Sequence, residues 1–297
     1  MKSSKALWVC SILTGLLALI ASTAGLFWPA GDGQPYAFTS VRGVEAQLYG
    51  QGLYAYDTYF KAPILRGSDA TILIVGLPLL LWALSWATKG RLRGMLGLAG
   101  VLSFFLYHAV SLAFGVFYNQ LALVYVAYVS ASLYAFILAF RAINVEELSK
   151  RVSQRAPVRG MAIFLFVAGL TVFVWLPDMI ASLLEGTAPA GLAHYTTEVT
   201  YIIDPAIIAP SAFVASYLIS KRRPMGFLMA PILLILNALV GVMVIGQTIF
   251  QAMAGIALTP AQLVAFVGSF TLMGLIAVWL LIKFFNYIRP PKREIDQ

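Results

Sequence analysis

Charged residues are scarce in this sequence. Of its 297 residues, 61% are hydrophobic and only 11% are Asp, Glu, Lys or Arg, whereas a water-soluble domain carries about 25% charged residues. The chain therefore has too little polar material to cover a surface that faces water. This shortage excludes an ordinary soluble domain and indicates that lipid is the solvent for most side chains.

Residues that bind metals and cofactors are also scarce. The chain has one cysteine, Cys10, which we expect to be a small packing residue, and two histidines, His108 and His194, without HxxxH or HExxH spacing. A metal or haem site is therefore not expected. The sequence also has no phosphate-binding glycine loop and no GxSxG. We expect no cofactor and assign no catalytic residue, and a nucleotide-driven pump would need a partner chain.

The sequence is rich in apolar runs of about 20 residues, the length that crosses the hydrocarbon core of a bilayer as a helix. Lipid offers the backbone no hydrogen-bond partners, so such segments form helices. The first run is too long for the apolar part of a secretory signal, and we keep it as a membrane helix. We predict an all-α fold: a polytopic transmembrane helix bundle that forms a single integral membrane domain over residues 1–297. The eight expected helices cover roughly 6–28, 70–88, 95–117, 120–141, 159–178, 200–220, 225–249 and 262–285.

Basic residues alternate between loops in the manner of the positive-inside rule. The segments on the side of both termini hold 17 of the 20 Lys and Arg residues, and only Arg42, Lys61 and Arg66 lie on the other side. Both termini are therefore expected in the cytoplasm, and we attribute the net charge of +8 to membrane orientation and not to nucleic acid. The basic residues expected inside are Lys2, Lys5, Lys89, Arg91, Arg93, Arg141, Lys150, Arg151, Arg155, Arg159, Lys221, Arg222, Arg223, Lys283, Arg289, Lys292 and Arg293. The acidic residues expected outside or at the outer boundary are Asp32, Glu45, Asp57, Asp69, Asp178, Glu185, Glu198 and Asp204.

The longest segment between expected helices is 29–69, which the charge pattern puts on the extracytoplasmic side as a loop. It contains four tyrosines, Tyr49, Tyr54, Tyr56 and Tyr59. Aromatic residues at such a boundary are typical of the belt at a membrane interface, and a ligand cage is the alternative.

Two stretches of the sequence, 76–94 and 208–226, are similar at a constant offset of 132 residues (208 minus 76). The similarity is that of two parallel four-helix repeats, 1–150 and 151–297, related by an axis along the membrane normal. The alternative is that any helical hairpin collects Lys, Arg and Gly at its turn, and the sequence leaves both open. The aligned pairs are Pro78 with Pro210, Lys89 with Lys221, Arg91 with Arg223 and Gly94 with Gly226.

Polar residues of the expected helices gather toward the extracytoplasmic ends. Tyr107, His108 and Ser111 recur at helical spacing and share a face. Because polar groups in lipid are costly, their one-sided distribution predicts a polar pocket open to the extracytoplasmic side, under the 29–69 loop. Within it, Arg66 or His108 would pair with one of the acids. The candidate ligand-binding residues are Asp204, Tyr201, Glu198, His108, Tyr118, Asn119, Asp69 and Arg66.

Each of these residues also has a structural interpretation. Asp204 stands before Pro205, a sequence typical of a helix N-cap followed by proline at the first helical position, and the same interpretation fits Asp69. Asn119 suits a turn. His108 suits a hydrogen bond between neighbouring helices.

Three segments resemble an uncharacterised family of polytopic prokaryotic membrane proteins with no assigned activity. They are GLYAYDTYFKAPILRGSDATILIVGLPLLLWAL (52–84), FFLYHAVSLAFGVFYNQLALVYVAYVSASLYAF (104–136) and VTYIIDPAIIAPSAFVASYLISKRRPMGFLMAPILL (199–234). The resemblance covers about half of the chain and implies a multi-pass protein of the cytoplasmic (inner) membrane of a prokaryote. It transfers no activity, and His108 is atypical of the pattern.

The sequence favours a protein that binds or transports a small polar or lipid-like ligand. One alternative is an intramembrane enzyme that acts on a lipid headgroup or a lipid-linked substrate, with an outer carboxylate as base. Another is a non-catalytic assembly or sensory subunit, whose partner would be a second membrane protein or another copy of this chain docked at the short cytoplasmic segment 142–158.

Overall fold

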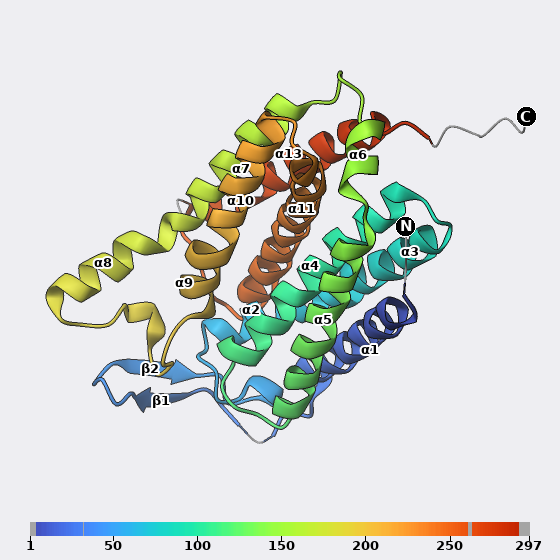
Figure 1. Ribbon diagram of the computed structural model, residues 1–297. Helices are drawn as coiled ribbons and strands as arrows, with labels where there is room; N and C mark the ends of the chain where they lie inside the picture. Colours follow the sequence, from blue (N-terminus) through green and yellow to red (C-terminus); the bar gives the residue numbers. More distant parts are fainter. Residues whose placement is uncertain (1–3, 32, 261–262, 291–297) are drawn as a thin grey trace, which may run out of the picture.

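The computed structural model describes residues 4–31, 33–260 and 263–290. Within these ranges, eight helical segments are long and apolar enough to cross a membrane, so the prediction of an all-α polytopic bundle is confirmed (Figure 1). Lys2, Asp32, Lys292, Arg293 and the expected helix start at 262 lie outside the described residues. The spans are Lys5–Phe27, Lys61–Thr88, Leu92–Gly115, Ala122–Ala142, Val158–Glu185, Val199–Ser220, Pro224–Met253 and Ser269–Asn286.

The elements follow one another with short connections. The helices are α1 (Lys5–Phe27), α2 (Lys61–Thr71), α3 (Leu77–Thr88), α4 (Leu92–Gly115), α5 (Ala122–Ala142), α6 (Val145–Arg151), α7 (Val158–Thr171), α8 (Leu176–Glu185), α9 (Val199–Ile203), α10 (Ala209–Ser220), α11 (Pro224–Met253) and α13 (Ser269–Asn286). The strands are β1 (Tyr36–Thr39) and β2 (Glu45–Leu48), paired antiparallel with Tyr36 opposite Leu48. Three π-helical segments, Ile72–Gly76, Asp204–Ile208 and Leu263–Gly268, precede α3, α10 and α13.

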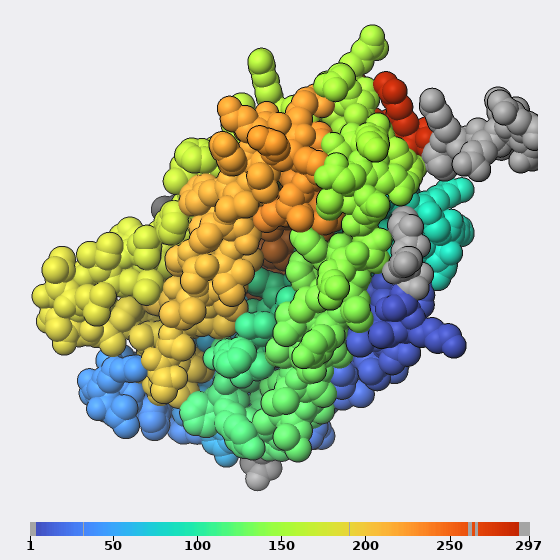
Figure 2. All heavy atoms as spheres, viewed as in Figure 1, coloured from blue at the N-terminus to red at the C-terminus, as the bar shows by residue number. Residues whose placement is uncertain are grey.

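Helices α4 and α11 form the centre of the bundle. Residues 94–102 of α4 and 230–236 of α11 are buried without interruption, which is the pattern of a helix surrounded by protein. Gly100 allows the two helices to approach closely, because a Cβ there would overlap the side chain of Ile235. In Figure 2 these two helices are visible only at the bottom of a furrow between α5 and α10. The surrounding helices present large apolar side chains outward, as contact with lipid requires.

The two ends of the bundle differ. The β1–β2 hairpin lies at one end, here named the hairpin end, while the start of α1, α6 and the end of α13 lie at the other, the terminal end (Figure 1). The hairpin is held down by Arg42, whose guanidinium donates hydrogen bonds to the carbonyls of Ala193 and Tyr195. The hairpin therefore covers the segment that leads into α9.

The second span begins earlier than predicted, which corrects the interpretation of Asp69. The helix starts at Lys61 and not at 70, so the loop expected over 29–69 ends before Lys61 and Asp69 is no N-cap. It lies in the middle of the helix with 0% exposure. The polar residues of 61–69 indicated a water-facing segment, but inside the fold they find partners on other elements, and the helix extends through them.

The N-cap interpretation of Asp204 is also wrong. The helix begins at Val199, five residues before Asp204, and the Asp204 side chain makes no capping hydrogen bond. The backbone instead widens into a π turn in which the N–H of Ala209 bonds to the carbonyl of Asp204. The prolines explain this widening, because Pro205 and Pro210 cannot donate to the helical ladder. The fifth span likewise continues past Asp178 as α8.

The offset of 132 residues recurs in the structure. It relates the π-helical segments at 72–76 and 204–208, helices α3 and α10 over their full lengths, and the starts of α4 and α11. Gly94 and Gly226 each lie against the backbone of the preceding helix, at Trp86 and at Leu218, again 132 apart. These coincidences agree with two repeats, and the duplication of 1–150 as 151–297 stays a prediction.

One contact between the halves obeys the same relation. Gly67 of α2 lies on α11, where a Cβ would overlap the backbone of Gln247. At the corresponding positions, Val199 of α9 contacts Gly115 of α4. Glycine therefore stands on one side of the first contact and on the opposite side of the second. The bulkier Val199 lies beside the cavity described next.

Candidate functional site

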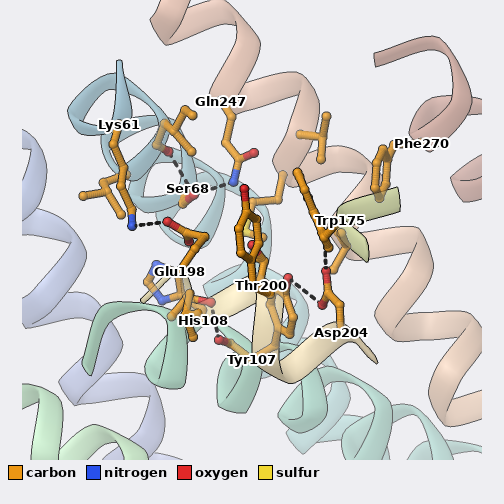
Figure 3. Close-up of a pocket in the computed structure, with 18 of the residues that line it drawn as sticks. Lys61, Ser68, Tyr107, His108, Trp175, Glu198, Thr200, Asp204, Gln247 and Phe270 are labelled. Atoms are coloured by element: carbon orange, nitrogen blue, oxygen red, sulfur yellow. Dashed lines mark hydrogen bonds and ion pairs between the residues drawn. The ribbon is translucent and has the colours of Figure 1, made fainter. Parts of the chain in front are cut away.

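A cavity of about 430 Å³ lies near the hairpin end, between α2, α4, α9, the π turn at 204–208 and α11 (Figure 3). Its volume falls in the range of small-molecule sites, about 300–1,000 Å³, and its wall combines many apolar side chains with few polar groups, as such sites do. The apolar lining includes Phe60, Ile64, Leu65, Leu112, Val172, Val199, Ile208, Leu236, Val240, Met243, Val244 and Phe270.

The cavity continues toward the hairpin. A second hollow, also of about 430 Å³, lies between β2 and residues 191–193 and reaches Ile256. Thr58, Phe60 and Gly191 line both hollows. These shared residues put the upper part of the cavity directly beneath the hairpin.

An ion pair stands at this upper part. Lys61, the first residue of α2, places its Nζ 2.7 Å from Oε2 of Glu198, the residue before α9. The ammonium also lies 4.1 Å from the centre of the Tyr195 ring. The pair joins the starts of two helices from different halves of the chain, and Figure 3 shows it across the cavity from Asp204.

Asp204 faces the cavity from the π turn. Its Oδ2 accepts a hydrogen bond from the indole N–H of Trp175 at 3.1 Å, and its Oδ1 accepts one from the Tyr107 hydroxyl at 3.4 Å. The Trp175 ring packs on Tyr201 with 5.6 Å between centroids, and the Tyr201 hydroxyl donates to Asp178. Asp204 is therefore held by neutral donors and surrounded by aromatic rings.

His108 lines the cavity, but its ring nitrogens face away from it. Nε2 lies 3.6 Å from Oδ1 of Asp69, and Nδ1 lies 3.3 Å from the hydroxyl of Tyr128. Asp69 lies behind the histidine, and its Oδ2 accepts a hydrogen bond from Tyr54 at 2.7 Å. Gly25 of α1 leaves room for this cluster, since a Cβ there would overlap the Asp69 carboxylate. The cluster supports one wall of the cavity.

Gln247 and Ser68 join α11 to α2 in the wall. The amide of Gln247 donates to the hydroxyl of Ser68 at 2.8 Å, next to the close approach at Gly67. The Ser68 hydroxyl donates in turn to the carbonyl of Ile64. These groups satisfy one another and fix the spacing of the two helices.

Asp57 lies in the segment above the cavity, outside the membrane spans. Its Oδ1 accepts hydrogen bonds from the Tyr195 hydroxyl at 2.7 Å and the Phe117 backbone N–H at 3.0 Å. Burial raises the pKa of Asp57 to about 6, against the lowering effect of these two bonds. Burial likewise raises the pKa of Tyr195 and lowers that of His194, whose ring stacks on Tyr195. Asp57 thus ties the end of α4 to the segment before α9.

Four of the predicted site residues line the cavity, namely Asp204, Tyr201, Glu198 and His108. The structure does not bring the other four to it. Asp69 lies behind His108, and Arg66 points to the Tyr49 hydroxyl and the Leu26 carbonyl. Tyr118 is 82% exposed, and Asn119 accepts from the Leu121 N–H in a turn. Of the predicted pairings, that of His108 with Asp69 is present.

Several lining residues were absent from the predicted set. Tyr107 shares the helix face that drew attention to His108, so its position was within reach of sequence reasoning. Lys61 was assigned to the loop because the start of α2 was placed too late. Trp175 had no signal, because its approach to Asp204 depends on how the segment between α7 and α8 packs against the π turn.

No model of a protein family matches the chain, and neither a curated protein nor a solved structure is similar to it at a significant level. The resemblance noted from the sequence therefore stays a prediction. In the described ranges, no three His, Cys, Asp or Glu residues lie close enough together to hold a metal ion.

Proposed function

We propose that the protein binds a small amphipathic ligand, polar at one end or lipid-like, in the cavity beneath the hairpin, and that it receives this ligand from the extracytoplasmic side. One observation carries the proposal: a cavity of drug-like size within a membrane bundle, apolar in most of its wall, with a few polar groups gathered in one region.

The orientation in the proposal rests on charge. The loops of the terminal end carry most of the basic residues, whereas the hairpin end has Arg42, Lys61 and Arg66. By the positive-inside rule the terminal end faces the cytoplasm and the hairpin end faces outward. The cytoplasmic membrane of a prokaryote is the location that agrees with the resemblance seen in the sequence.

Transport is the form of this function that the helix geometry favours. Both α2–α3 and α9–α10 are interrupted by π-helical segments, which occur often at functional sites. Carrier folds commonly place interrupted helices beside the substrate. Asp204 lies in one such segment and faces the cavity.

The enzymatic alternative has less support. It assigned His108 as partner of a catalytic carboxylate, but both ring nitrogens are directed at Asp69 and Tyr128 and neither reaches the cavity. A general base must lie within hydrogen-bond reach of the proton that it abstracts. No contact of His108 favours that role over support of the wall.

A cavity-filling variant tests the proposal. Val244 of α11 lines the cavity, while Val242 on the same helix is exposed on its outer face. Binding of the neutral probe 4-phenylbutanol would be measured calorimetrically on the full chain in nanodiscs, with empty nanodiscs as blank. We expect Val244→Trp to weaken binding at least tenfold and Val242→Trp to leave it unchanged. Equal binding by both variants, or no binding to the wild type above the blank, would contradict the proposal.

A further inference from the structure

The charges that face the cavity do not cancel. Four ionisable side chains with formal charge or the capacity for it line the cavity: Lys61, Glu198, His108 and Asp204. Lys61 and Glu198 neutralise each other at 2.7 Å. What a ligand meets therefore depends on the other two.

His108 contributes no net charge. It lies 3.6 Å from Asp69, and both side chains are almost fully buried. If the imidazole is protonated, the carboxylate balances it, and if Asp69 holds the proton, both groups are neutral. Tyr54 and Tyr128, which complete this cluster, are neutral donors or acceptors.

Asp204 is left without a counter-ion. Its partners are the indole N–H of Trp175 and the hydroxyl of Tyr107, and among the described residues no Lys, Arg or His forms an ion pair with it. A carboxylate offers about four acceptor positions, so two hydrogen bonds do not saturate it. Glu198, the nearest acid across the cavity, is already paired with Lys61.

The neighbours of Asp204 are aromatic. Trp175 and Tyr201 pack against each other beside it, and Tyr107 bonds to it directly. Phe270 also lines this region, and Figure 3 shows it on the same side of the cavity as Trp175 and Asp204. Electron-rich ring faces attract cations, most strongly where water is excluded.

We infer that the ligand of this cavity is a lipophilic amine, with its ammonium group at Asp204 among the aromatic rings and its apolar body along α2 and α11. The inference rests on the proposed function and specifies its ligand class. An anionic ligand would face an unbalanced carboxylate in a poorly solvated site, which is unfavourable. A cation supplies the missing counter-charge.

Three probes of the same shape test the inference: 4-phenylbutylamine, which is cationic at neutral pH, 4-phenylbutanol, which is neutral, and 4-phenylbutyrate, which is anionic. Binding to the full-length wild type in nanodiscs of a zwitterionic lipid would be compared by calorimetry. We expect the amine to bind at least tenfold more tightly than the alcohol, and the carboxylate to bind most weakly. Equal or tighter binding of the carboxylate would overturn the inference without the need for any variant.

The variant Asp204→Asn keeps the shape of the side chain and removes its charge. We expect it to weaken binding of the amine at least tenfold while binding of the alcohol changes less than twofold, which also shows that the variant is folded. Asp178→Asn is the matched control, because Asp178 lies two turns before the end of α8 and is not part of the cavity wall. It should leave the preference for the amine intact.

The outcomes separate the two proposals. If the alcohol binds in a manner sensitive to Val244→Trp but the amine has no advantage, the cavity binds ligands and the inference of a cationic ligand is wrong. If none of the three probes binds above empty nanodiscs, the proposed function fails and the inference fails with it.

Discussion

The imidazole of His108 and the carboxylate of Asp69 lie 3.6 Å apart, on helices α4 and α2, with side-chain exposures of 2% and 0%. Tyr54 holds the second oxygen of Asp69, and Tyr128 lies beside the second nitrogen of His108. The cluster therefore links four segments of the chain through buried polar groups. A buried carboxylate that loses its partner is far more costly than the pair itself is stabilising.

We predict that His108→Ala destabilises the protein by about 3–5 kcal/mol, because it leaves Asp69 buried without its partner. The double variant Asp69→Asn/His108→Ala should recover a large part of this loss, because an amide is cheaper to bury alone than a carboxylate. Unfolding in mixed micelles measures both. If the single variant is no less stable than the double one, the two side chains do not act as a pair.

Glycine at position 67 is predicted to be indispensable for the packing of α2 on α11. A Cβ there would overlap the backbone of Gly246 and Gln247, and backbone cannot move aside as a side chain can. Gly67→Ala should therefore cost about 2 kcal/mol or more. At Gly97 the nearest atoms are those of the Trp86 ring at 3.8 Å, an ordinary contact, so Gly97→Ala should be neutral or stabilising by up to about 1 kcal/mol. Similar unfolding midpoints for the two variants would contradict the close approach.

The sequence predicted the membrane helices well because their signal is local. A run of about 20 apolar residues has few alternatives to a spanning helix, and all eight expected spans have counterparts. The offset of 132 residues was likewise readable, since the turns after α3 and α10 have the same length and similar residues.

The candidate site was predicted only in part because its polar residues act across the fold. Asp69 and Lys61 suggested a water-facing loop, and only their partners His108 and Glu198, far along the chain, explain why α2 contains them. Trp175 reaches Asp204 through the packing of two interrupted spans, which no periodicity encodes. The prolines marked the region of the π turn but not its form.

The ion pair of Lys61 and Glu198 is expected to be worth about 1 kcal/mol, because both side chains are partly exposed, at 12% and 20%. A double-mutant cycle with Lys61→Met and Glu198→Gln measures the coupling free energy, which should fall as salt concentration rises. The pair of Arg151 and Glu147, within one turn of α6 and with Glu147 48% exposed, is the comparison and should give about 0.3–0.5 kcal/mol. Equal coupling in the two cycles would mean that the position above the cavity adds nothing.

Stability is predicted to depend on pH through Asp57. Burial raises its pKa in the folded protein to about 6, whereas the carboxyl group titrates near 3.8 when unperturbed. The folded state therefore binds the proton more tightly. The resulting contribution to stability is fully present below about pH 4 and is lost as the pH rises through about 6, to a total of about 3 kcal/mol.

Two variants check this sign. In Asp57→Asn the loss between pH 4.5 and 7.5 should disappear, so the unfolding temperatures of wild type and variant should diverge at low pH and approach each other, or cross, at high pH. In Tyr195→Phe the carboxylate loses the hydroxyl that donates to it at 2.7 Å, which raises the pKa of Asp57 further and moves the loss of stability to higher pH. Wild-type and Asp57→Asn curves that stay parallel over this range would show that the buried carboxyl does not control the pH dependence, because only a group whose proton affinity changes on folding can bend one curve relative to the other.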